Sequence, residues 1–131
     1  MDKYYTKVRD YLLDLNYIIS SENEESGLFV VSREEEGINN LVIGCSDPIL
    51  IIEQHIFDMP SDSMETYKAL LKKNRDIVHG AFVLDEEGKK VIFRDTLQLE
   101  NLDRNELEGS INSLSLLLSE FSWEIISFSK N

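Results

Sequence analysis

The chain has 131 residues, of which 42% are hydrophobic and 29% charged, and its formal net charge at pH 7 is −12. This length and composition predict one globular domain over residues 1–131. An acidic chain repels phosphate backbones and anionic membrane surfaces, and no segment has the roughly 18 apolar residues of a membrane span, so we expect neither nucleic acid nor a membrane as partner. The N-terminus lacks the apolar core of a signal peptide, which predicts a cytoplasmic protein.

The first half of the chain predicts one helix followed by strands. A helix is expected over residues 2–15, because its apolar residues are spaced by three and four: Tyr5, Val8, Leu12 and Leu15. Residues 17–19 predict only a short extended piece. Three strands follow, joined by a glycine-ended loop and a proline turn, at residues 28–32, 38–45 and 49–57. Short loops between consecutive strands predict an antiparallel meander.

The second half predicts a helix, a hairpin and a long final helix. The middle helix begins after Asp62 or Ser63 and ends near residue 73, with an inner stripe of Met64, Tyr67, Leu70 or Leu71, and Asn74. The hairpin strands are expected at residues 81–84 and 90–94. The fold class is therefore α+β, with a five-stranded antiparallel sheet and the element order α-β-β-β-α-β-β-α.

The final helix has the strongest pattern in the chain. Asp103 followed by Glu106 is a capping box, which marks a helix start. Beyond it, apolar residues step by four and three along one side: Leu107, Ile111, Leu114, Leu118, Phe121, Ile125 and Phe128. Such steps also suit a coiled coil, but a short run in a mixed domain favours packing against the chain's own sheet.

The strands carry more apolar surface than one helical layer covers. A sheet with one solvated face alternates apolar and polar residues, yet residues 28–31 and 49–52 are apolar at every position. Monomers rarely expose large apolar patches. The second face is therefore expected to be covered by a further helix, a second copy or a client polypeptide.

The residues that most often carry chemistry are few and scattered. His55 and His79 lack the spacing of metal ligands, and Cys45 is the single cysteine, so we expect no metal, no cofactor and no enzymatic activity. A nucleophilic pair of Cys45 with a histidine is the enzymatic alternative. The acidic turns at residues 34–37 and 85–88 lack the ligand pattern of a calcium loop and are expected to be hairpin turns.

A resemblance becomes visible from residue 70 onwards. The residues that carry it are Leu70, Leu71, Asn74, residues 80–85, Gly88, residues 91–93, Leu97, Leu99, Leu102, Asp103, Leu107 and Trp123. In these positions the chain resembles the type III secretion chaperone fold and, within it, the YbjN-like proteins, some of which are called molecular chaperone Tir or sensory transduction regulator.

The resemblance implies a dimeric, non-enzymatic domain that holds an extended or partly folded segment of another protein. In that fold the second helix and the following strand commonly make the dimer contact, which corresponds here to Met64, Tyr67, Leu71, Phe82 and Leu84. The third predicted strand adds three candidate dimer or partner contacts: Ile49, Ile51 and Phe57. Secretion effectors as clients are not implied, because fold alone does not define function.

Two functional hypotheses follow. The first is a homodimer with a chaperone-like activity, which binds a client polypeptide through apolar contacts. The alternative is an acidic regulatory adaptor or inhibitor of a basic protein, which predicts association that weakens with salt. Residues 61–79 hold four bases and three acids, so this segment also offers a basic surface for self-association against an acidic one.

Overall fold

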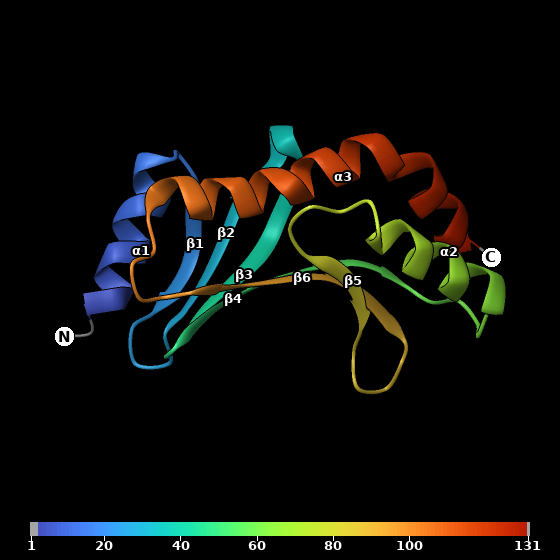
Figure 1. Ribbon diagram of the computed structural model, residues 1–131, viewed down its shortest axis with the longest axis horizontal. Coiled ribbons are helices and arrows are strands. Elements are labelled where there is room, and N and C mark those ends of the chain that lie inside the picture. The colour runs from blue at the N-terminus through green and yellow to red at the C-terminus, as the bar shows by residue number, and fades with distance from the viewer. Residues whose placement is uncertain (1–2, 131) are drawn as a thin grey trace.

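The computed structural model describes residues 3–130, which form six strands, three α-helices and a short 3₁₀ turn (Figure 1). In chain order these are α1 (Lys3–Asp14), β1 (Ile18–Asn23), β2 (Leu28–Arg33), η1 (Glu34–Glu36), β3 (Ile38–Ser46), β4 (Ile49–Asp58), α2 (Met64–Asn74), β5 (Ala81–Leu84), β6 (Lys90–Gln98) and α3 (Arg104–Lys130). One sheet runs in the spatial order β1-β2-β3-β4-β6-β5, and every neighbouring pair is antiparallel.

The α+β class and the antiparallel sheet are confirmed, but the sheet has six strands rather than five. The added strand is β1, of which the sequence suggested only residues 17–19. Its outer half, from Ser20 to Asn23, is polar, so apolar alternation gives no signal there. Backbone pairing with β2 holds it instead, from Ile18 opposite Ser32 to Asn23 opposite Leu28. The predicted helix start at Asp2 lies outside the described residues.

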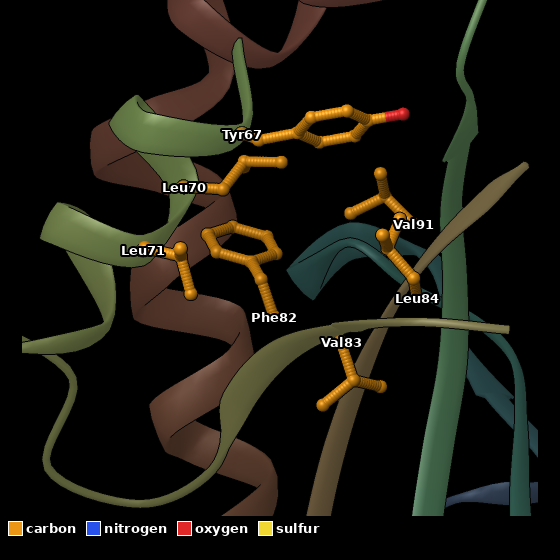
Figure 2. Close-up of a pocket in the computed structure, with 7 residues that line it drawn as sticks. All are labelled: Tyr67, Leu70, Leu71, Phe82, Val83, Leu84 and Val91. Carbon is orange, nitrogen blue, oxygen red and sulfur yellow. The ribbon is translucent and has the colours of Figure 1, made fainter. Parts of the chain in front are cut away.

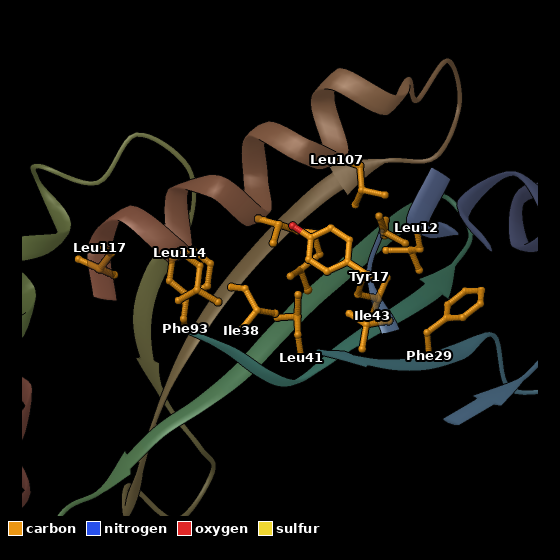
Figure 3. Packing of buried hydrophobic residues seen from close by; sticks show 14 of the residues in the cluster. Leu12, Tyr17, Phe29, Ile38, Leu41, Ile43, Phe93, Leu107, Leu114 and Leu117 are labelled. Carbon is orange, nitrogen blue, oxygen red and sulfur yellow. The ribbon is translucent and has the colours of Figure 1, made fainter. Parts of the chain in front are cut away.

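All three helices lie on one face of the sheet (Figure 1). At one end, the ring of Tyr5 from α1 stacks on Phe29 of β2, with 4.4 Å between centroids. Along the middle, α3 lays Leu107, Ile111 and Leu114 on the strands, where all three are buried. Figure 3 shows Leu107, Leu114 and Leu117 of α3 above Ile38, Leu41 and Phe93 of the sheet. The predicted apolar stripe of the last helix thus faces its own sheet.

Side-chain caps fix where the helices begin. Before α3, the Asp103 carboxylate accepts from the backbone N–H of Glu106 at 2.8 Å, and the Glu106 carboxylate accepts from the N–H of Asp103 at 3.1 Å. The predicted capping box is therefore confirmed. Before α2, the Ser63 hydroxyl accepts from the N–H of Thr66. Of the two predicted caps, Ser63 is the one used.

The inner side of α2 differs from the prediction. Thr66 and Leu70, four residues apart, are buried, whereas Met64 is 72% and Leu71 67% exposed. The predicted stripe placed Met64 inside, which is wrong, because helix phase follows the buried pair Thr66 and Leu70. Two large apolar side chains of α2 consequently face solvent.

The β5–β6 hairpin is closed by its predicted acidic turn. Asp85 accepts from the backbone N–H groups of Lys89 and Lys90, at 2.8 and 3.0 Å. These backbone hydrogen bonds, with that of Lys90 foremost, lower the pKa of Asp85. Gly88 completes the turn with φ of 73°.

Candidate protein-binding surfaces

An apolar groove lies between α2 and the edge strand β5 (Figure 2). Its volume is about 210 Å³, and it is lined by Tyr67, Leu70, Leu71, Phe82, Val83, Leu84 and Val91. Figure 2 shows Tyr67, Leu70 and Leu71 reaching from α2 towards Phe82. Four of the predicted contact residues, Tyr67, Leu71, Phe82 and Leu84, meet here, although they come from two separate elements.

Asn74, at the end of α2, attaches β5 to the helix. Its side-chain amide accepts from the N–H of Phe82 at 2.8 Å and donates to the carbonyl of Phe82 at 3.2 Å. Asp85 bonds to Lys90 across the hairpin. Hydrogen-bonded and non-hydrogen-bonded residues alternate along an antiparallel pair, and Phe82 lies three residues before Asp85. Phe82 is therefore a non-hydrogen-bonded residue, and its N–H and C=O groups point away from β6. Asn74 therefore occupies the position at the β5 edge that another strand would take.

Aromatic rings from α3 support the groove from below. Phe121 lies 5.9 Å from Phe82 and 6.0 Å from Phe128, and Phe128 lies 6.3 Å from Phe57, measured between ring centroids. The ammonium of Lys73 sits 5.0 Å from the centroid of Phe121. Offset and edge contacts of this kind stabilise aromatic clusters. Phe82 of β5 is thus packed against an aromatic cluster of Phe121, Phe128 and Phe57, which we call the aromatic base of the groove.

Phe57 belongs to this base and not to the uncovered sheet face. Strict alternation along β4 places it on the same side as Ile49 and Ile51. A bulge between His55 and Phe57 shifts the register, so Phe57 turns to the helix-covered face and is buried against Phe128. The sequence carries no glycine or proline at this position to signal the bulge.

Apolar and charged side chains are exposed in the groove and on the neighbouring surface of α2. Met64 and Leu71 are exposed on α2, and Leu84 is exposed on β5. Lys68 and Lys72 of α2 are also exposed. Tyr67 donates its hydroxyl to Asp62 at 2.9 Å, and this hydrogen bond raises the pKa of Tyr67. The exposed side of α2 therefore carries apolar and basic side chains, with Asp62 and Glu65 near its start, on a chain that is acidic as a whole.

The second sheet face has no helix over it in the described part of the chain (Figure 1). Its exposed or half-buried apolar side chains include Ile18, Leu28, Val30, Val42, Ile49, Ile51, Val83 and Ile92. One cross-strand row runs Leu28, Gly44, Ile51 and Thr96. The next row contains Glu53 and Arg94, whose side chains pair at 2.7 Å. This ion pair, which apolar spacing did not reveal, makes the face mixed rather than purely apolar.

The residues that could form a nucleophilic pair, Cys45 and a histidine, do not lie together. Cys45 pairs with Leu50 across β3 and β4, and His55 follows five residues further along β4, which corresponds to about 17 Å of strand. His55 contacts Asp58 at 2.7 Å, and the backbone carbonyl of His79 accepts from Ser113. In residues 3–130, no group of three or more His, Cys, Asp or Glu is arranged to hold a metal ion. No helix among those residues is long and apolar enough to cross a membrane.

A six-stranded antiparallel sheet, covered on one face by three helices, has the fold of the type III secretion chaperones. The chain belongs to this family: the model described as CesT_Tir_1 matches residues 1–131. Among curated proteins, none matches the sequence.

Solved structures share the fold at low sequence identity. YbjN from E. coli is 14% identical with a TM-score of 0.69, and 91% of each chain is covered. The HopA1–SchA chaperone–effector complex contains a chain that is 13% identical with a TM-score of 0.64, covering 98% of this chain and 94% of that one. The Yersinia pestis type III secretion chaperone SycH, solved with a fragment of YscM2, is 14% identical with a TM-score of 0.58, covering 97% and 100%.

Proposed function

We propose that this chain is a non-enzymatic, chaperone-like domain of the cytoplasm that acts as a homodimer and holds a segment of a client protein. One observation carries the proposal: the groove between α2 and β5 is apolar, and two of the residues that line it, Leu71 and Leu84, are exposed. Exposed apolar patches of this kind mark interaction sites. Membership of a chaperone family supports a polypeptide as the partner.

The dimer contact is proposed at the rim of this groove. A twofold contact uses the same patch on both copies, so Leu71 of one copy would pack near the groove of the other. Because Asn74 already bonds the backbone of Phe82, the contact would be made by side chains and not by pairing of two β5 strands.

The client is proposed to bind the uncovered face of the sheet and the β1 edge, away from the dimer contact. Ile49 and Ile51 lie on the uncovered face; Leu28 is in the same cross-strand row as Ile51, and Val42 is in the next row, opposite Glu53. At the other sheet edge, β1 pairs only with β2 and its residues are mostly exposed. An extended segment could add there as a further strand, with apolar side chains turned to the uncovered face.

The oligomeric state of the protein and of two matched variants tests the proposal. Size-exclusion chromatography with light scattering is expected to give a dimer for the wild-type chain. Leu71→Glu, which places a charge in the proposed contact, is expected to give a folded monomer. Leu13→Glu, at an exposed apolar position of α1, is the control and is expected to remain dimeric. A monomeric wild-type chain, or a Leu71→Glu variant that stays dimeric, would contradict the proposed contact.

A further inference from the structure

The outer side of α3 carries a second apolar surface that the dimer and client sites do not use. Trp123 is 81% exposed and Leu116 59% exposed. They are seven residues apart, which is about two helical turns, so both point away from the sheet along one stripe, and exposed Ile126 lies one turn beyond Trp123. We call Leu116, Trp123 and Ile126 the outer α3 stripe. None of them lines the groove between α2 and β5.

The side chain of Leu116 lies between two surface grooves and lines both of them. On one side it borders a groove of about 320 Å³ together with Ile77 and Val78 from the segment before β5. On the other side it borders a groove of about 680 Å³ together with Glu35 and Glu36 of η1. Side chains of a second helix can pack into grooves on either side of such an apolar side chain.

Two serines of α3 form hydrogen bonds to the segments that line these grooves. Ser113 donates to the backbone carbonyl of His79 at 2.8 Å, and Ser115 donates to the backbone carbonyl of Glu36 at 2.8 Å. The segments on both sides of the helix are thereby held at a fixed distance from it. The grooves are therefore part of the folded structure and need not be formed on binding.

The charged side chains in the two grooves beside Leu116 determine which kind of partner this surface can bind. Four acids line the two grooves: Glu35, Glu36, Asp76 and Glu120. Against them stand Lys73, whose ammonium lies over Phe121, and Arg33, which contacts Glu35 and Glu36. An acidic excess remains, and each copy carries a net charge of −12. A second copy would bring like charges together at this surface, whereas lysine or arginine on a partner would complement it.

We propose that the outer α3 stripe binds an amphipathic helix of another protein, with leucine-like side chains along its apolar face and lysine or arginine at its flanks. Leu116 and Trp123 would be the apolar anchors, and the acidic walls would orient the partner. This surface adds to the proposed function and rests on it only in taking the chain to be a polypeptide-binding protein.

A synthetic helix provides the probe. The peptide has about 18 residues, or roughly 27 Å of helix, with leucines spaced by three and four and lysines on both flanks. Trp123 is the only tryptophan of the chain, so a tryptophan-free peptide that covers it is expected to shift its fluorescence emission to the blue. A matched peptide with glutamate in place of every lysine is expected not to bind.

Variants locate the binding, with calorimetry as the common readout. Leu116→Ser is expected to weaken binding of the lysine peptide by about tenfold or more, and Leu13→Ser on α1 is expected to leave it unchanged. Leu71→Glu is expected to bind the peptide as well as the wild-type chain, so that failure of the dimer proposal and failure of this one give different results. Both serine variants replace exposed side chains, so their unfolding midpoints are expected to match that of the wild type.

Several results would overturn the proposal. These are no binding of the lysine peptide, equal binding of the glutamate peptide, or full binding by Leu116→Ser. A wild-type dimer that Leu116→Ser dissociates would show that the occupant is a second copy.

Discussion

The side chain of Asn74 satisfies both backbone polar groups of Phe82 and so joins the last turn of α2 to β5. Replacing it in Asn74→Ala leaves those groups without their partner in a half-buried position. The free energy of unfolding is expected to fall by about 1 to 3 kcal/mol, as measured by urea denaturation. Asn105→Ala, at an exposed position near the start of α3, is the matched control and is expected to change it by less than about 0.5 kcal/mol.

Amide hydrogen exchange separates this role from a general loss of stability. In Asn74→Ala, the N–H of Phe82 is expected to exchange faster than in the wild type, and by a larger factor than the N–H groups of β3, because this N–H has lost its hydrogen-bond acceptor. If the variant were as stable as the wild type, or if Phe82 kept its protection, the hydrogen bonds to Asn74 would not be what holds the edge strand.

Residue-level roles were only partly predictable. Spacing placed Asn74 on the inner side of α2, but its bonds to Phe82 depend on where β5 ends up and have no local signature. Phe57 shows the same limit. Alternation along β4 gave it the wrong face, because a single bulge between His55 and Phe57 reverses every side chain beyond it.

At the scale of elements, α3 has two apolar sides with different tasks. Leu114 is fully buried on the sheet, whereas Leu116, two residues on, is 59% exposed. We expect Leu114→Ala to lower the free energy of unfolding by roughly 2 to 5 kcal/mol, because it removes packed methyl groups and leaves a cavity. Leu116→Ala is the control within the same helix, expected to change stability by less than about 0.5 kcal/mol. Equal losses in the two variants would mean that α3 does not face the sheet as described.

The elements themselves were readable where local chemistry and periodicity agree. For α3, the box of Asp103 and Glu106 and the steps of three and four gave both the start and the buried side. For β1, neither signal exists, because its outer half is polar and its place at the sheet edge comes from pairing with β2. The exposed side of α3 was also missed, since an amphipathic pattern is read from the stripe that faces the core.

At the scale of the whole molecule, the candidate surfaces depend on the strand order. β5 and β6 form a hairpin, but β6 joins the sheet beside β4, which brings β5 to the edge where α2 lies against it. The spacing of apolar residues does not tell whether β6 pairs with β4 or with β1. The prediction that some sheet surface remains uncovered needed only the apolar strands, whereas the groove between α2 and β5 required this order.

Charge gives the last prediction, which concerns the proposed dimer. Two chains of net charge −12 repel each other, and the proposed contact also brings together α2 helices that expose Lys68 and Lys72 on both copies. Salt screens both repulsions and leaves apolar contacts intact. The dissociation constant of the dimer is therefore expected to fall by roughly threefold or more between about 0.05 M and about 0.5 M sodium chloride, measured by sedimentation equilibrium.

A matched pair of variants assigns part of this effect to α2. Lys72→Gln and Lys7→Gln change the net charge equally, but only Lys72 lies beside the proposed contact. At low salt, Lys72→Gln is expected to form the tighter dimer of the two, because it removes a like charge from the interface. A dimer that weakens as salt is added would instead indicate that the basic α2 of one copy pairs with an acidic segment of the other, and the apolar contact through Leu71 would then have to be abandoned.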